Sequence, residues 1–160
     1  SIKTTTNLPI NSDKVTIAFW MKTTQTAVAI IAELSAVFDS NNAFAAYTNS
    51  PANKITIADH TSTYNRSSGS TTINNGSWYH IVATIDRGLG TNQTKIYINN
   101  SLVTVIDMAG DLNGNFVDNI LFIGQRDGSS LGFNGSLTKL KIYNYPFTAG
   151  EVSTLYNSEL

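Results

Sequence analysis

The chain has 160 residues, no cysteine and a formal net charge of −1, from ten basic and eleven acidic side chains. The absence of cysteine excludes disulfides, thiolate zinc sites and thiol catalysis, and a balanced charge without a basic stripe argues against nucleic acid as a partner. Only 13% of the residues are charged, so hydroxyl and amide side chains supply most of the polarity, a composition that we associate with extracellular and virion-surface β proteins.

The longest apolar run, residues 27–38, contains Glu33 and Ser35. It is also shorter than the about 20 residues that a helix needs to cross a bilayer. We therefore expect no membrane insertion.

Alternation of apolar and polar residues with a period of two dominates the chain and predicts half-buried antiparallel strands. In residues 54–58, for example, Ile55 and Ile57 point to one side. The predicted strands, in chain order, are 15–22, 27–34, 42–48, 54–58, 78–86, 94–99, 101–106, 119–124 and 137–144. Turn residues separate them at 39–42, 49–53, 73–77 and 99–100, and the last pair needs positive φ for a tight hairpin.

Residues 145–157 predict one short helix near the C-terminus. Thr148 is placed to cap its start, and Glu151, three residues later, completes a capping box. Phe147 and Val152 have the spacing of a hydrophobic staple. The apolar face of the helix consists of Val152, Leu155 and Tyr156.

Many short strands followed by one helix predict an all-β fold, a sandwich of two antiparallel sheets with one short C-terminal helix. The sequence has no internal repeat of fixed period and no linker. We therefore expect residues 1–160 to form a single domain.

Three blocks of sequence, taken in order, resemble one known family. VTIAFWMKT (15–23) is similar to a family strand that ends in an aromatic followed by a basic residue. WYHIVATIDRG (78–88) and TKIYINNSLV (94–103) stand where the family has a Trp-x-His strand, a turn and a Tyr-x-Asn-Gly hairpin. Residues 121–157 are similar to its Ile-Gly, Phe-x-Gly and Arg-x-Tyr-Asn motifs and its final capped helix. The chain thus resembles the laminin G-like members of the concanavalin A-like lectin/glucanase superfamily, which implies a jelly roll of two curved sheets.

Two features depart from the family. Many relatives carry an acidic pair after the Phe-x-Gly motif, whereas residues 137–139 read Leu-Thr-Lys here, which weakens the case for a calcium site that depends on that carboxylate. The N-terminal strand that commonly precedes the first block is short or missing. We therefore expect the domain to be a module of a longer protein.

Catalysis is the minority hypothesis. A glycosidase needs two carboxylates that face one bond, about 5–10 Å apart. The chain has three glutamates, Glu33, Glu151 and Glu159, and none has a carboxylate partner two residues away, the spacing that the resemblance to glucanases implies. The sequence also lacks a G-x-S-x-G nucleophile elbow, and its only histidines are His60 and His80.

The stretch DLNGN begins like a calcium loop, with Asp111, Asn113 and Asn115 at alternate positions. An EF-hand loop also needs glycine at its sixth position and glutamate at its twelfth, and these positions hold Phe116 and Phe122. The EF-hand motif therefore fails. The three residues stay candidates for calcium binding through an oxygen-rich loop, and a plain Asn-Gly turn is the commoner explanation. The sequence requires no cofactor.

Sugar binding by such a sandwich would use loop aromatics that stack on sugar rings, with Asn, Asp and Arg to hold hydroxyl groups. The loop or strand-end candidates are Tyr47, Tyr64, Arg66, Arg126, Asp127, Phe133 and Tyr145. The stretch GQRDGSSLG (124–132) is the most interesting, because it is rich in glycine and joins two strand blocks. The alternative for each candidate is an ordinary loop residue.

His80 invites a catalytic interpretation, because it lies in the aromatic stretch GSWYHIVATID (76–86). Trp78 and Val82 share its strand face, and no carboxylate occurs at strand spacing before Asp86. His80 therefore lacks the partner that orients a general base. We expect a packed, hydrogen-bonded histidine, covered by loops or by the second sheet.

Two hypotheses of function remain. The first is a noncatalytic recognition module of an extracellular, cell-surface or virion protein that binds glycan or a surface receptor. The second is a structural or assembly domain that contacts neighbouring protein subunits. A shallow groove with two or more exposed aromatics favours the first, and an extended exposed apolar patch favours the second. A glucanase-like enzyme ranks third.

Overall fold

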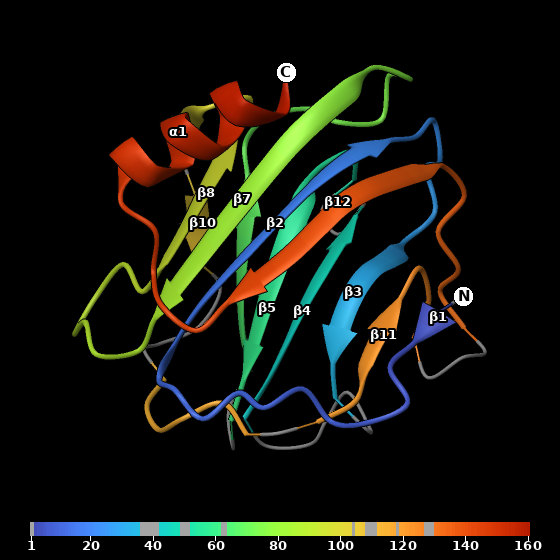
Figure 1. The fold of residues 1–160 in the computed structure, drawn as a ribbon. Coiled ribbons are helices and arrows are strands. Elements are labelled where there is room, and N and C mark those ends of the chain that lie inside the picture. Colours follow the sequence, from blue (N-terminus) through green and yellow to red (C-terminus); the bar gives the residue numbers. More distant parts are fainter. Residues whose placement is uncertain are drawn as a thin grey trace.

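Two antiparallel sheets lie face to face in the computed structural model, as the sequence predicts (Figure 1). The structure describes residues 2–35, 42–48, 52–61, 64–103, 105–107, 112–117, 119–126 and 130–160. The elements are β1 (Ile2–Lys3), β2 (Lys14–Lys22), β3 (Ala29–Leu34), β4 (Ala43–Thr48), β5 (Ile55–His60), β6 (Tyr64–Gly69), β7 (Trp78–Asp86), β8 (Thr94–Ile98), β9 (Ser101–Val103), β10 (Val105–Asp107), β11 (Leu121–Ile123), β12 (Ser136–Tyr143) and α1 (Ala149–Glu159). The seven-stranded sheet has the order β1-β11-β3-β4-β5-β6-β10, and the five-stranded sheet has the order β12-β2-β7-β8-β9.

The core lies between the two sheets and follows the period-two pattern of the sequence. Ile55 and Ile57 on β5 belong to it, and so do Ile81 and Ile85 on β7. Val82, between the two β7 isoleucines, packs in a separate cluster on the outer face of the five-stranded sheet. The predicted division of β7 into two faces is therefore confirmed. Burial of each large apolar side chain contributes about 1.5–3 kcal/mol to the stability of the fold.

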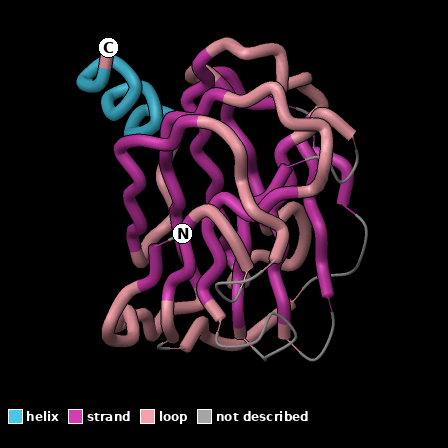
Figure 2. Tube along the Cα trace, turned by 90° about the vertical axis from the view of Figure 1, so that its right-hand side faces the viewer, coloured by secondary structure: helices cyan, strands magenta, loops and turns pink. Residues whose placement is uncertain are grey.

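Helix α1 covers the outer face of the five-stranded sheet, and Figure 2 shows it outside the layer of strands. The predicted capping box is present, because the Thr148 hydroxyl accepts a hydrogen bond from Glu151 N while the Glu151 carboxylate accepts one from Thr148 N. Phe147 and Val152, the predicted staple, pack in the same apolar cluster. The described residues include no helix long and apolar enough to span a membrane.

One strand prediction was wrong, and one strand was missed. Residues 101–106 do not form one strand, because β9 pairs with β8 in the five-stranded sheet whereas β10 pairs with β6 in the seven-stranded sheet. Strand β6 was missed altogether, since its sequence YNRSSG is polar and lacks apolar alternation. Such a strand forms because both of its edges are paired, with β5 and with β10.

The predicted tight hairpin is present between β8 and β9. Asn99 and Asn100 both have positive φ, 49° and 66°, the backbone conformation that a two-residue type I′ turn needs. Asn99 also accepts a hydrogen bond from His80 N through its side-chain oxygen, at 2.9 Å. The turn is thereby tied to the middle of the sheet.

Candidate functional site

The predicted ligand residues do not meet at one place. Tyr145 is 43% exposed and contacts Tyr143 and Phe147 on the side of the five-stranded sheet. Phe133 is half-buried and packs against the core between the sheets. Tyr47 lies on the outer face of the seven-stranded sheet, where only 4% of its surface is exposed, so it offers no open stacking platform.

Two predicted arginines lie on the same outer face as Tyr47. The strand register places Glu33, Ala45, Ala58 and Arg66 in one row across β3, β4, β5 and β6. Arg126 reaches this row from the loop after β11, where its Nε donates to Glu33 Oε2 at 2.9 Å. The spacing of neighbouring strands, about 4.8 Å, puts roughly 14 Å between the Cα atoms of Glu33 and Arg66. Asp127 and the side chain of Tyr64 lie outside the described residues.

The DLNGN loop is held by hydrogen bonds to the protein itself. The side chain of Gln93 bonds both the N–H and the carbonyl oxygen of Leu112, and Asn115 donates to Asn11 Oδ1 at 2.9 Å. Asn113 is exposed, and Asp111 lies outside the described residues. Among the described residues, no three His, Cys, Asp or Glu side chains gather as metal ligands, so calcium binding by Asp111, Asn113 and Asn115 stays a prediction.

A buried ion pair, which the sequence analysis missed, lies beside the DLNGN loop. Arg87 Nη2 donates to Asp59 Oδ1 at 2.5 Å, and both side chains are at most 2% exposed. Arg87 Nη1 also donates to the carbonyl oxygen of Gly114, and the guanidinium lies 3.8 Å from the centre of the Phe116 ring. Burial raises the pKa of Asp59, and the hydrogen bonds from Arg87 counteract that shift.

His80 is packed as predicted, but its environment differs from the expectation. The residue is 1% exposed, and its ring stacks at a tilt against Trp20 and Tyr156, at 5.1 and 5.4 Å between ring centres. Helix α1 provides the cover in place of loops or the second sheet. The imidazole nitrogens make no hydrogen bond with the described residues.

The carboxylate that the sequence analysis did not find near His80 comes from the last turn of α1. Glu159 Oε2 lies 3.5 Å from His80 Nε2 and accepts a hydrogen bond from Trp20 Nε1 at 2.8 Å. Glu159 Oε1 accepts one from Lys141. Burial lowers the pKa of His80 although the Glu159 charge acts in the opposite direction. Burial by itself raises the pKa of Glu159, yet the bonds from Lys141 and Trp20 hold that pKa below its ordinary value.

A small hollow opens beside this cluster, on the outer face of the five-stranded sheet. We call it the tryptophan hollow; its volume is about 280 Å³, and its lining residues are Trp20, Trp78, Thr138, Lys139, Glu159 and Leu160. Trp78 is 43% exposed. Sequence reasoning assigned Trp78 to the packing of His80 and did not consider Trp20 as its partner, although alternation along β2 and β7 puts both tryptophans on one face.

A bulge in β12 shapes one wall of the hollow. The pairing of β12 with β2 shifts between Thr138 and Lys141, and Lys139 between them adopts positive φ, 54°. The bulge turns the Lys139 side chain toward the helix end, where Nζ donates to the carbonyl oxygen of Glu159 at 2.7 Å. Backbone strain of this kind in a residue other than glycine often occurs at functional sites.

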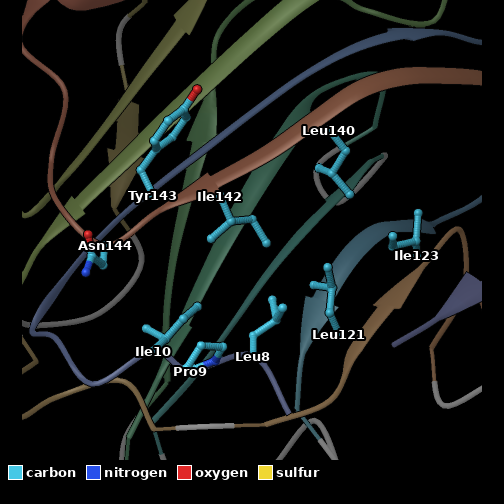
Figure 3. A pocket seen from close by; sticks show the side chains of 9 residues that line it. All are labelled: Leu8, Pro9, Ile10, Leu121, Ile123, Leu140, Ile142, Tyr143 and Asn144. Atoms are coloured by element: carbon cyan, nitrogen blue, oxygen red, sulfur yellow. The ribbon is translucent and has the colours of Figure 1, made fainter. Parts of the chain in front are cut away.

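A second, larger cleft lies at the open edge of the sandwich, between β11 and β12 (Figure 3). Its volume is about 520 Å³, and its lining residues are Leu8, Pro9, Ile10, Leu121, Ile123, Leu140, Ile142, Tyr143 and Asn144. In Figure 3, Pro9 lies between Ile10 and Leu8 at the bottom of the cleft, and Tyr143 and Asn144 lie on its left side. The cleft offers apolar contact and few hydrogen-bonding groups.

The three glutamates of the chain do not form a facing pair. Glu33 lies on the outer face of the seven-stranded sheet, bound by Arg126, whereas Glu159 lies over the outer face of the other sheet. Glu151 belongs to the capping box at the opposite end of α1 from Glu159. Each carboxylate has a structural role.

The two antiparallel sheets and the C-terminal helix together define a β-sandwich domain. The chain belongs to the concanavalin A-like lectin/glucanases superfamily, whose family model matches residues 1–153. The resemblance found in the sequence is thereby confirmed. No protein of curated function matches the chain in sequence.

Several solved structures share the fold. A heptameric SAP-like pentraxin from Limulus polyphemus is 19% identical with a TM-score of 0.72, and the match covers 96% of this chain and 74% of the pentraxin. Domain 4 of an extracellular GH43 arabinanase from Geobacillus stearothermophilus, in complex with arabinotriose, is 19% identical with a TM-score of 0.70, covering 94% and 71%. The CBM40 of a Ruminococcus gnavus IT-sialidase is 15% identical with a TM-score of 0.66, covering 97% and 95%. At these identities the likeness establishes the fold alone.

Proposed function

We propose that this domain is a noncatalytic recognition module that binds glycans on behalf of an extracellular, cell-surface or virion protein. The observation that carries the proposal is the tryptophan hollow, in which an exposed indole borders a concave surface with hydroxyl, ammonium and carboxylate groups.

Sugar recognition fits the chemistry of this hollow. The C–H face of a sugar ring is apolar and packs on an indole, while polar groups at the edge of the site hold the ring hydroxyls. Trp78 offers the indole, and Thr138 and Lys139 are exposed beside it. The volume of about 280 Å³ is just below the range of about 300–1,000 Å³ for drug-sized ligands, so we infer that one sugar ring occupies it.

The similar structures support a binding role. One of them is a domain described in complex with arabinotriose. Another belongs to botulinum neurotoxin type C, whose cell entry depends on two ganglioside molecules, although the match covers only 36% of that chain. A recognition role also agrees with the engagement of all three glutamates in structural contacts.

Trp78→Ala tests the proposal on a glycan array and then by calorimetry with the best ligand. We expect the affinity to fall about tenfold or more, because truncating an aromatic side chain at the centre of a binding site usually has an effect of this size. Tyr145→Ala is the matched control, because Tyr145 is also 43% exposed but lies away from the hollow. A chelator arm tests the predicted involvement of calcium.

Three outcomes would contradict the proposal. Loss of binding in Tyr145→Ala but not in Trp78→Ala would move the site away from the hollow. Cleavage of a bound polysaccharide would make the domain an enzyme. Absence of binding to every glycan, together with self-association that a polar substitution in the apolar cleft abolishes, would favour the assembly hypothesis.

A further inference from the structure

Positive charge surrounds the tryptophan hollow although the chain as a whole carries a net charge of −1. Lys139 lines the hollow, and Lys141 bonds the carboxylate of Glu159, which also lines it. Lys22 on β2 is the cross-strand partner of Trp78 on β7. Of these three lysines, only Lys141 is paired with the Glu159 carboxylate. A neutral ligand would gain little from this excess of positive charge.

The three lysines are not equivalent. Lys141 pairs with the Glu159 carboxylate, and Lys139 donates to the carbonyl oxygen of the same residue. Lys22 is exposed, and its ammonium group makes no ion pair or hydrogen bond with the residues that the structure describes. Lys22 therefore presents a charge that is available to a ligand.

Lys22 and Trp78 are direct cross-strand partners. The register pairs their Cα atoms across β2 and β7, each at the end of its strand, and Trp20 lies two residues before Lys22 on the same face. Directly opposed residues in an antiparallel pair have Cβ atoms about 5 Å apart. The flexible four-carbon stem of lysine can thus bring its ammonium group to the edge of a ring that rests on the indole.

We propose that the tryptophan hollow selects an anionic sugar, with the ring on Trp78 and its carboxylate or sulfate group paired with Lys22. This inference rests on the proposed glycan-binding function and adds the charge of the ligand and a specificity residue. The pairing forms a charge-assisted hydrogen bond, which is roughly twice as strong as one between neutral groups.

Matched ligand pairs that differ only in charge test the inference by calorimetry. Oligogalacturonate and its methyl ester form the first pair, sialyllactose and its methyl ester the second, and a sulfated galactan oligosaccharide and its desulfated form the third. We expect the wild-type chain to bind the charged member of at least one pair about tenfold more tightly. The first two pairs report on carboxylates, and the third reports on sulfate.

Lys22→Gln should abolish this preference and leave the affinity for the neutral member unchanged. Lys22→Arg should keep most of it. Lys95→Gln is the matched control, since Lys95 is an exposed lysine on β8 of the same sheet, and it should not change the preference. The affinity of wild type for the charged ligand should also fall with added salt more steeply than that of Lys22→Gln.

Each result has a distinct meaning. Equal affinity for charged and neutral members in the wild type, with binding still dependent on Trp78, overturns this inference and leaves the glycan-binding function intact. A charge preference that survives Lys22→Gln overturns the role of Lys22. Binding that does not depend on Trp78, or no binding of any member, overturns the proposed function and this inference together.

Discussion

The buried ion pair between Arg87 and Asp59 gives the sharpest stability prediction. Arg87→Met keeps most of the aliphatic volume of the side chain and removes its charge. Because Asp59 is 2% exposed, its carboxylate would then be buried without a cation. Removing one partner of a buried pair costs about 3–5 kcal/mol, and the lost donor to Gly114 adds to this.

A loss of about 4 kcal/mol is a large share of the 5–15 kcal/mol of a typical domain. For a chain of this length, each kcal/mol lowers Tm by about 2–4 °C. We therefore expect Tm to fall by roughly 8–16 °C, measured by differential scanning calorimetry, with urea unfolding as a check on the free energy. Lys14→Met is the matched control, because the side chains of the Lys14–Asp86 pair are 36% and 16% exposed and pairs nearer the solvent contribute less than buried ones.

The pH dependence separates an unpaired charge from lost packing. Without Arg87, the largest influences that counteract burial are lost, so the pKa of Asp59 rises further above its unfolded value of about 3.9. The folded variant then takes up a proton more readily than the unfolded chain, and its stability increases as pH falls. The deficit relative to wild type should therefore be smaller at pH 5 than at pH 8. A deficit below about 1 kcal/mol, or one that does not change with pH, would refute this reasoning.

Two further predictions concern the helix and the residues beneath it. His80→Gln should lower the free energy of unfolding by about 1–2 kcal/mol through lost ring contacts with Trp20 and Tyr156, with glycan affinity nearly unchanged; a loss of binding at unchanged Tm would contradict this. Because the pKa of His80 is lowered in the folded chain, the unfolded chain takes up the His80 proton at a higher pH. The stability of wild type should therefore fall as pH drops through about 6.5. The stability of His80→Gln should lack this contribution to the pH dependence. Thr148→Ala should cost about 1 kcal/mol by removing the N-cap, and Thr148→Ser should restore most of it in thermal unfolding; equal Tm values for the two variants would show that the cap contributes nothing.

The sequence by itself determined the features that depend on neighbouring residues. The period-two pattern placed Ile81 and Ile85 on one face of β7 and Val82 on the other, because the faces of a strand follow directly from its alternation; the structure showed that the isoleucines face the core. The capping box identified the start of α1 for the same reason, since Thr148 and Glu151 are three residues apart. The positive φ of Asn99 and Asn100 followed from the short connection in sequence between two predicted strands, which requires a tight turn.

Only the tertiary structure decided what covers each outer face and which distant residues meet. Glu159 lies 3.5 Å from His80 although 79 positions separate them in the chain. No pattern of neighbouring residues in the sequence predicts that contact. The polar strand β6 exists because β5 and β10 pair with its two edges, and backbone pairing of this kind leaves no trace in hydrophobic alternation.

The candidate site follows the same division. The sequence alone predicts an aromatic face on β7, but it assigns the sugar-binding residues to the loops. The docking of α1 and the bulge at Lys139 turn part of that face into a hollow with an exposed indole. A concave site forms where separate elements pack together, and the tertiary fold determines which elements do so.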